Sequence, residues 1–301
     1  MNNKSLNILI LIILISSCNT KQFVKNSVFI VDNTKYEFIK VEQGIFDMGC
    51  EPSTLDNLIV GKKYDCMCTS SNIKENVKVD SFYISKYFIT RKQFKQFIDE
   101  TNYITSLDSL GKISVAIKDT ISKVPFPKDV NYQIDRKLPY TGYSASIIDI
   151  NWQYSSYLKK YGDNELDHPV SFVSIYDAKA FCKWLSRRLN KNIRLLVEKE
   201  WEFAARGGNN SEGHCRPGTN KPFKNIIDTS YAYVIHPSVP VTSYIPNELD
   251  IYCLNKSEMV DTYYNQMLVI RGGIVWSRRV TPVKYGEISS TVHFRVVIDL
   301  T

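Results

Sequence analysis

The chain has 301 residues, 44% of them hydrophobic, and carries a formal net charge of +7. This length and composition suit one large or two small globular domains, with enough apolar side chains for a sizeable core. The 38 lysines and arginines are scattered along the chain rather than clustered, which argues against a nucleic-acid-binding surface. We therefore expect a folded domain whose partner is not a nucleic acid.

The N-terminus has the pattern of an export signal. Lys4 precedes an apolar run at 6–15, which leads into Ile15-Ser16-Ser17-Cys18. A basic start, a short apolar core and small residues before the cut are typical of a signal peptide, and the run is too short for a comfortable membrane span. The last four residues also fit the bacterial lipobox, in which the cysteine becomes the lipidated first residue. The alternative is an ordinary signal peptide with a chance cysteine.

These features predict a lipoprotein signal peptide at 1–17, a lipidated polar tether at 18–35 and one domain at 36–301. Acyl chains on Cys18 would hold the protein at a membrane, because each buried methylene contributes about 0.8 kcal/mol. Asn19 follows the cysteine in place of aspartate, which favours the outer membrane over inner-membrane retention in a Gram-negative cell. The expected location is the outer membrane, facing the periplasm.

The first part of the domain predicts strands and then a helix. Residues 38–49 alternate between apolar and polar side chains around a Gln-Gly turn, which indicates a β-hairpin. Residues 77–84 alternate in the same way and predict a further strand. A helix is predicted after Thr90, which caps it together with Gln93 three positions later.

Residues 103–150 are polar, show no clear period and contain three prolines. This composition predicts a long irregular excursion from the domain. A loop of that length is either functional or an insertion.

Two further helices are predicted in the middle of the chain. A capping box begins the first helix at Ser174, and apolar residues then recur at helical spacing. The second helix starts near Glu198 and ends at the Arg206-Gly207-Gly208 turn. Trp184 and Trp201 lie on the two helices, and we expect them to anchor one shared core.

The segment 168–208 resembles the signature block of the formylglycine-generating enzyme family, also called sulfatase-modifying factors. It matches in order through HPV, VS..DA..FC.WL and RL..E.EWEFAARGG. The later LVIRGG and HFRVV segments match the same family, so that the resemblance covers roughly residues 36–299. It implies an α+β domain with a modified C-type-lectin-like fold, low in regular secondary structure, with helices packed beside short antiparallel sheets.

The resemblance implies that oxidase members hold Cu(I) with two cysteines that follow the Gly-Gly turn. Its register places Ser277 and Pro282 at these two positions, and no cysteine lies beyond Cys253. An alcohol does not replace a thiolate on Cu(I), and a proline side chain has no ligand atom. We therefore expect no copper, unless Cys253 or another thiol reaches the cleft from elsewhere in the chain, and we assign no catalytic residue.

The remnant of the family's cleft is assigned to four residues: Arg271, Trp276, Ser277 and Arg295. For the two arginines we favour a structural role in buried hydrogen bonds.

In family members, the segment that aligns with 256–261 supplies oxygens to a structural calcium. The usual GNVWEW is replaced here by KSEMVD. Glu258 and Asp261 remain candidate ligands, but calcium needs six to eight oxygens. A structural calcium thus stays a candidate, and no other cofactor is assigned.

A second departure from the family lies at the start of the helix near Glu198. The family has a Pro-Thr pair there, in which the threonine caps the helix, whereas this chain has Leu196-Val197. Valine accepts no hydrogen bond, and such a loss costs about 0.5–2 kcal/mol.

Six cysteines remain beside Cys18, and an even set in an oxidising compartment suggests disulfides. Three of them lie close together in the sequence, so a bridge from Cys50 to Cys66 or Cys68 is favoured. A soft metal on the Cys-x-Cys pair is the alternative. Cys182 lies on the apolar face of a helix and is expected to be a buried thiol.

The favoured hypothesis is a membrane-tethered, non-catalytic family member that acts as a binding or assembly module. The resemblance gives a precedent in lipoproteins of gliding motility and type IX secretion. The partner is a protein or a glycan. One alternative is a formylglycine-generating oxidase acting on sulfatases. Another is a lectin-like glycan binder, which requires exposed aromatic residues such as Trp276 or Tyr263.

Overall fold

The computed structural model describes residues 26–49, 75–118, 130–138, 142–155, 158–208, 239–243, 246–252, 257–272, 277–282, 288 and 292–300. The sequence predictions for several residues lie outside these ranges: Cys18, Cys50, Cys66, Cys68, Cys253 and Trp276.

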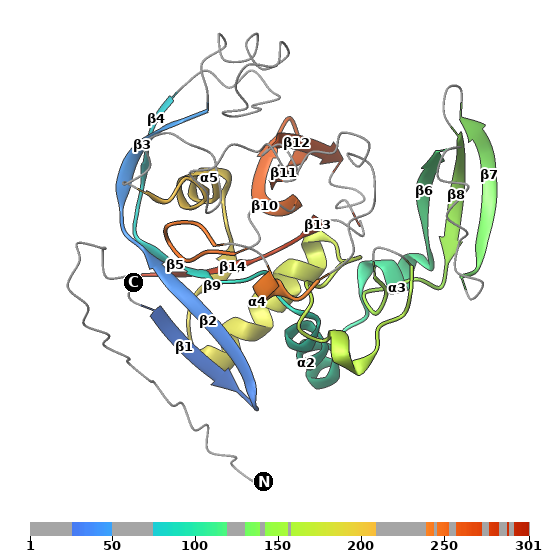
Figure 1. Cartoon of the computed structure of the whole chain (residues 1–301), viewed down its shortest axis with the longest axis horizontal. Helices are drawn as coiled ribbons and strands as arrows, with labels where there is room; N and C mark the ends of the chain where they lie inside the picture. The colour runs from blue at the N-terminus through green and yellow to red at the C-terminus, as the bar shows by residue number, and fades with distance from the viewer. Residues whose placement is uncertain are drawn as a thin grey trace.

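A five-stranded antiparallel sheet with the order β1-β2-β5-β14-β9 runs through the body of the protein (Figure 1). Its strands are β1 (Asn26–Val31), β2 (Thr34–Val41), β5 (Phe82–Ser85), β9 (Ile193–Leu195) and β14 (Val296–Asp299). The predicted tether at 18–35 is therefore too long, because residues 26–35 belong to a hairpin of this sheet. The folded part begins no later than Asn26.

The predicted hairpin over 38–49 is wrong. β2 pairs with β1 and β5, whereas β3 (Gly44–Met48) pairs with β4 (Glu75–Val79) in a separate two-stranded sheet. The predicted strand at 77–84 is likewise divided between β4 and β5. The backbone N–H of Gln43 donates to Ser81 Oγ at 2.8 Å, which ties the two points where the chain leaves one sheet for the other.

Helices α2 (Arg91–Thr101), α4 (Ile175–Leu189) and α5 (Glu198–Ala205) form as predicted. The capping boxes that begin α2 and α4 are both present, at Thr90 and Ser174. α2 and α4 pack through aromatic rings, and the rings of Phe94 and Phe181 lie 6.0 Å apart.

The two tryptophans belong to different cores, so the prediction of one shared core is wrong. Trp184 packs in a cluster with Phe38 and Val296. Trp201 packs in another, with Ile39 and Val297. Successive residues of a strand face opposite sides of a sheet, so the two clusters lie on opposite faces of the five-stranded sheet.

The segment 103–150 is not an irregular loop. It contains α3 (Ser106–Leu110) and a three-stranded antiparallel sheet of β6 (Lys112–Lys118), β7 (Tyr132–Leu138) and β8 (Gly142–Ile148), in the order β6-β8-β7. Figure 1 shows this sheet extending from the body as an arm. Its prolines fall between the strands, and an irregularity between Ile134 and Arg136 interrupts the alternation of β7.

A four-stranded sheet lies beside α5 (Figure 1), in the order β12-β11-β10-β13. Its strands are β10 (Ser257–Tyr264), β11 (Met267–Gly272), β12 (Ser277–Pro282) and β13 (Val292–His293). Two short 3-10 helices, η2 (Asp163–Glu165) and η5 (Val241–Ser243), complete the described elements. Among these residues, no helix is long and apolar enough to span a membrane.

This sheet supplies the cap that α5 lacks. Val197 gives no side-chain cap, as predicted. The hydroxyl of Thr262 on β10 instead accepts the backbone N–H of Glu198 at 2.8 Å. Glu200 accepts the N–H of Val197 at 3.0 Å. The start of α5 is thus hydrogen-bonded by a strand far along the chain.

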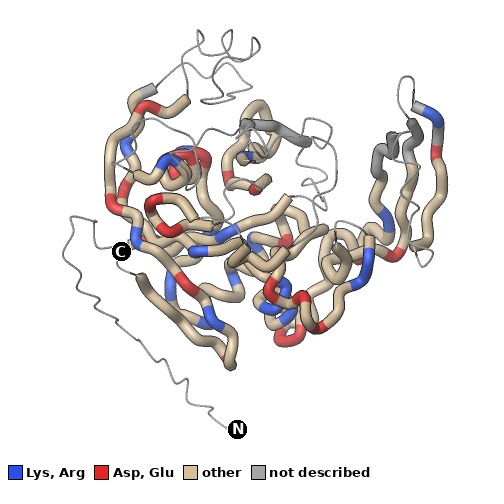
Figure 2. The backbone as a smooth tube through the Cα atoms, viewed as in Figure 1, with Lys and Arg blue, Asp and Glu red and all other residues tan. Residues whose placement is uncertain are grey.

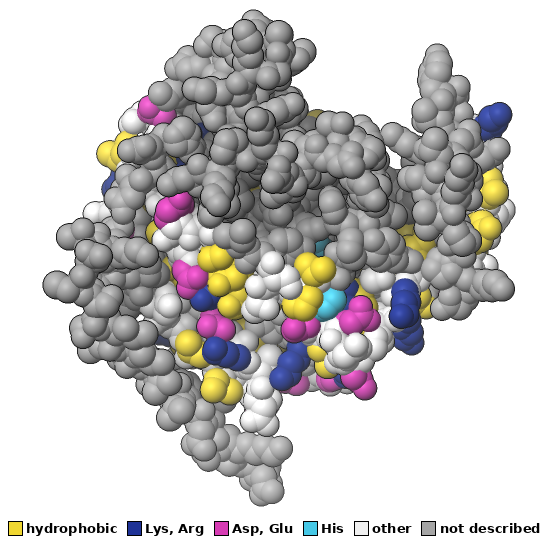
Figure 3. Space-filling model, in the orientation of Figure 1, with side chains coloured by type: hydrophobic (Ala, Val, Ile, Leu, Met, Phe, Trp, Pro, Cys, Tyr) yellow, Lys and Arg dark blue, Asp and Glu magenta, His cyan; other side chains and the backbone are white. Residues whose placement is uncertain are grey.

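Basic and acidic residues are interspersed along the described backbone (Figure 2). On the face in Figure 3, lysine and arginine side chains lie next to aspartate and glutamate side chains, with hydrophobic side chains between them. Neither view shows a large area of one sign within the described part of the chain.

Candidate functional site

The two arginines assigned to the remnant cleft are both buried. Arg271 on β11 is 7% exposed, and Arg295 between β13 and β14 is 0% exposed. A buried guanidinium is tolerated only where its charge and its N–H groups are compensated. The partners of each arginine therefore show what it does.

Arg295 forms an ion pair with Glu258 of β10. Its Nε donates to the two carboxylate oxygens at 2.9 and 3.1 Å. Its other nitrogens donate to the backbone oxygens of Ser85 and Tyr252, at 3.3 and 2.9 Å. The indole of Trp201 donates to the same carboxylate at 2.8 Å. Glu258 is 0% exposed, and burial raises its pKa while Arg295 and Trp201 oppose that rise.

Arg271 pairs with two glutamates of α5. Its Nη2 donates to Glu202 at 2.7 Å, and its Nη1 lies 3.3 Å from Glu198. The guanidinium also lies over the ring of Trp201, 4.9 Å from the centroid. This ion pair and the Arg295 pair thus meet at one tryptophan.

Among the described carboxylates of this network, Glu202 accepts hydrogen bonds from the largest number of groups. Besides Arg271, it accepts from Arg206 at 2.6 Å and from the backbone N–H of Gly49 at 2.8 Å. Burial alone would raise the pKa of Glu202, but the charges of Arg271 and Arg206 and the Gly49 hydrogen bond outweigh it. The pKa of Glu202 therefore lies below the usual glutamate value. The network holds β3, α5 and β11 together.

The two candidate calcium ligands have other partners. Glu258 is bonded to Arg295 and Trp201, and Asp261 lies 2.7 Å from Lys179 Nζ. No group of three or more His, Cys, Asp or Glu in the described ranges is placed to hold a metal ion. The residues described here do not fit calcium, because the hard cation needs several free oxygens at one point.

The positions aligned with the copper cysteines lie at the two ends of β12. Ser277 is opposite Gly272 and Pro282 is opposite Met267 of β11. An alcohol and a proline side chain offer no thiolate, so these two residues do not fit a two-sulfur Cu(I) site.

Cys182 is a buried free thiol on α4, as expected. Burial raises the pKa of its sulfur, so that it stays protonated and is a poor metal ligand. It packs in the cluster of Trp184, on the face of the five-stranded sheet opposite Trp201. It therefore lies in a different core from Trp201, where the two ion pairs meet.

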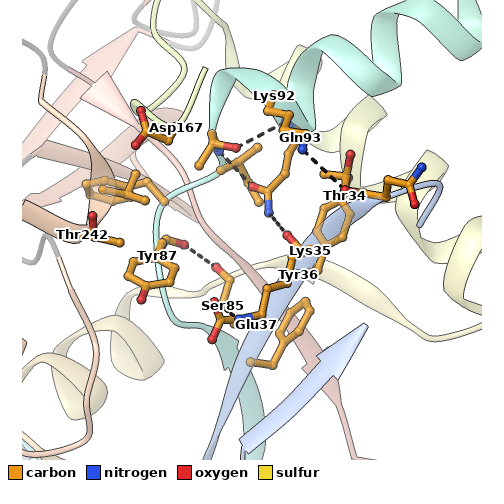
Figure 4. Close-up of a pocket in the computed structure, with 16 residues that line it drawn as sticks. Thr34, Lys35, Tyr36, Glu37, Ser85, Tyr87, Lys92, Gln93, Asp167 and Thr242 are labelled. Carbon is orange, nitrogen blue, oxygen red and sulfur yellow. Dashed lines mark hydrogen bonds and ion pairs between the residues drawn. The ribbon is translucent and has the colours of Figure 1, made fainter. Parts of the chain in front are cut away.

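The structure also places a cavity that the sequence did not indicate. Its volume is about 250 Å³, and it lies between β2, the segment that follows β5 and the start of α2 (Figure 4). Asp167 and Thr242 complete its wall. Because the lining comes from segments far apart in the chain, no single motif marks it.

The model of the sulfatase-modifying factor enzyme 1-like domain matches residues 28–298. The chain belongs to this family. The predicted family and the predicted α+β fold are thereby confirmed.

Relatives in the family carry two kinds of name. The formylglycine-generating enzyme of Bos taurus is 25% identical over 172 residues, which are 57% of this chain and 40% of that protein. The inactive C-alpha-formylglycine-generating enzyme 2 of Mus musculus is 31% identical over 145 residues, 48% of this chain and 42% of that protein. The chain thus spans less than half the length of these curated relatives.

A solved structure shares the fold. PvdO from Pseudomonas aeruginosa superposes with a TM-score of 0.57 at 18% identity, and the match covers 88% of this chain and 94% of that one. At this identity the likeness shows the fold alone.

Replacing Glu202 with Gln is expected to make the free energy of unfolding depend less on pH in the acid range. The native pKa of Glu202 lies below the usual value of about 4.3. The stabilisation that ionised Glu202 gives the fold is therefore complete when the pH is above the usual glutamate pKa, and it is lost as the pH falls through the native pKa. Glu202→Gln should lower the free energy of unfolding by roughly 3–5 kcal/mol near neutral pH. The difference in this free energy between the variant and the wild type should become smaller in acid.

The measurement is urea unfolding near pH 7 and near pH 3. Glu42→Gln, at an exposed surface ion pair with Lys40, is the control and should change little at either pH. A destabilisation by Glu202→Gln that is the same at both pH values would contradict the pairing.

Proposed function

We propose that this chain is a non-catalytic member of the sulfatase-modifying factor family that acts as a binding or assembly module at a membrane. The observation that carries the proposal is the pair Ser277 and Pro282 on β12. Neither residue has a sulfur atom. A thiol pair that could hold Cu(I) is therefore missing where the family's register expects it.

The ion-pair network supports the same conclusion. Arg271 and Arg295 have carboxylate partners within the fold, and both are buried. Their charges are compensated by these carboxylates, and the ion pairs join α5, β10 and β11 around Trp201. These arginines explain why the RGG and HFR segments persist in a chain without the cysteines.

A relative in the family has a name that fits this proposal. The mouse protein that is 31% identical over its matched segment is named as inactive. Since the bovine match is named as an enzyme, the proposal rests on the residues of this chain and not on the names.

The purified protein should not convert a sulfatase-type cysteine peptide to formylglycine. The peptide would be incubated in air with metal-free protein and with protein loaded with one equivalent of Cu(I), and the products read by mass spectrometry. Because no sulfur stands at 277 or 282, both samples should match the blank. The formylglycine-generating enzyme of Thermomonospora curvata serves as the positive control. Copper-dependent conversion by this chain would refute the non-catalytic role.

We also propose that the module is anchored through lipid on Cys18, in the outer membrane and facing the periplasm. The support is the basic start, the apolar run at 6–15 and the Ile-Ser-Ser-Cys sequence. Two acyl signals are enough for stable anchoring, whereas one chain binds only marginally.

In a bacterial host, the wild type should sediment with membranes and incorporate labelled fatty acid. Cys18→Ala should lose the label and move to the soluble fraction, because no acyl chain then holds it. Thr20→Ala, two positions after Cys18 and outside the lipobox, is the matched control and should behave as the wild type. Label retained by Cys18→Ala would rule out this anchor.

A further inference from the structure

We propose that the 250 Å³ cavity beside β2 binds one ring of a neutral saccharide. This inference rests on the proposed role as a binding module and names the class of its partner. The cavity borders the Arg295 network, because Ser85, whose backbone oxygen accepts from Arg295, and Phe88, whose ring centroid lies 4.5 Å from the guanidinium carbon, both line it. None of the charged residues of that network lines the cavity.

The size of the cavity limits the ligand. Pockets for drug-sized molecules are about 300–1,000 Å³, and this one is smaller. It suits a single sugar ring or the end of a chain, rather than a folded segment of another protein. The cavity runs from the β1–β2 turn at Asn33 to η5 at Thr242.

An aromatic ring with a fixed position stands in the wall. Tyr87 packs on Tyr252, with ring centroids 4.9 Å apart. Lys86 Nζ forms an ion pair with Asp250 at 2.5 Å and lies 5.7 and 5.3 Å from the two ring centroids. Because these contacts hold the ring before any ligand arrives, binding need not order it. An aromatic face of this kind matches the apolar face of a pyranose.

Hydrogen-bond acceptors surround this ring. Glu37 on β2 and Asp167 ahead of α4 have carboxylates that are 27% and 61% exposed. In Figure 4, Tyr87 lies between these two residues, with Thr242 to one side. A carboxylate offers about four acceptor sites, so that the rim can receive several hydroxyl donors at once.

The opposite wall is rigid and already hydrogen-bonded. Gln93 accepts the N–H of Thr90 at 2.9 Å and donates to the backbone oxygen of Lys35 at 2.7 Å. This wall gives the cavity its shape. The ligand would be contacted mainly by Tyr87, Glu37 and Asp167.

The charges lining the cavity balance. Lys35 lies 2.9 Å from Glu37, and Lys92 donates to the backbone oxygen of Asn33 at 3.4 Å. With Asp167, the lining holds two lysines and two carboxylates. It therefore gives no net preference for a cation or an anion, which favours a ligand that is uncharged, has many hydroxyl groups and has one apolar face. A saccharide has these properties.

The test is saturation-transfer NMR and calorimetry with glucose, galactose, mannose, N-acetylglucosamine and cellobiose, with butylamine and inorganic phosphate as charged probes. We expect at least one neutral sugar to bind. Tyr87→Ala and Asp167→Asn should each weaken it roughly tenfold, equivalent to about 1.4 kcal/mol. Tyr87→Phe should bind nearly as well as the wild type, because it keeps the ring.

Tyr132→Ala is the matched control, since Tyr132 on β7 is 44% exposed and does not line the cavity. Its affinity should be unchanged. Asp167→Asn alters one exposed carboxylate, so it tests the site even if Tyr87→Ala fails to fold. Binding that both cavity variants leave intact would overturn the proposal, as would binding of butylamine or phosphate alone, or of no probe by folded wild type. These readouts are independent of formylglycine formation, so the two proposals can fail separately.

Discussion

The pairing of Arg295 with Glu258 is the constraint on which the centre of this fold depends. Both side chains are fully buried, and each would be strongly destabilising without the other. Arg295 also joins separate parts of the chain, because it donates to the backbone oxygens of Ser85, at the end of β5, and of Tyr252. Trp201 joins it to the second network of Arg271, Glu198 and Glu202.

These ion pairs serve the fold of the family and do not require the copper chemistry of its oxidase members. The arginines that look like remnants of a cleft are bound to carboxylates and compensate charge in the interior. A chain can then lose the sulfur ligands at 277 and 282 and still need the surrounding segments. Thr262, which caps α5 in place of a helix residue, likewise serves the fold, since a neighbouring strand has taken over a local role.

Local patterns predicted what depends on local chemistry. The capping boxes at Thr90 and Ser174 and the missing cap at Val197 were visible because each involves residues a few positions apart. Alternation also marked β2 and β3, but a period of two does not name a partner strand, so the hairpin was mispaired. The partners of Glu258 and the lining of the cavity come from distant segments, and no spacing in the sequence reveals them.

The most direct test of this account is a double-mutant cycle on the central pair, read as the free energy of unfolding in urea. Glu258→Leu and Arg295→Met should each cost roughly 3–5 kcal/mol, because each leaves a buried charge without its partner. The double variant should lose clearly less than the sum of the two, which gives a coupling of about 2 kcal/mol or more. Losses that add within about 0.5 kcal/mol would show that the two side chains do not depend on each other, and the account of the fold's centre would be wrong.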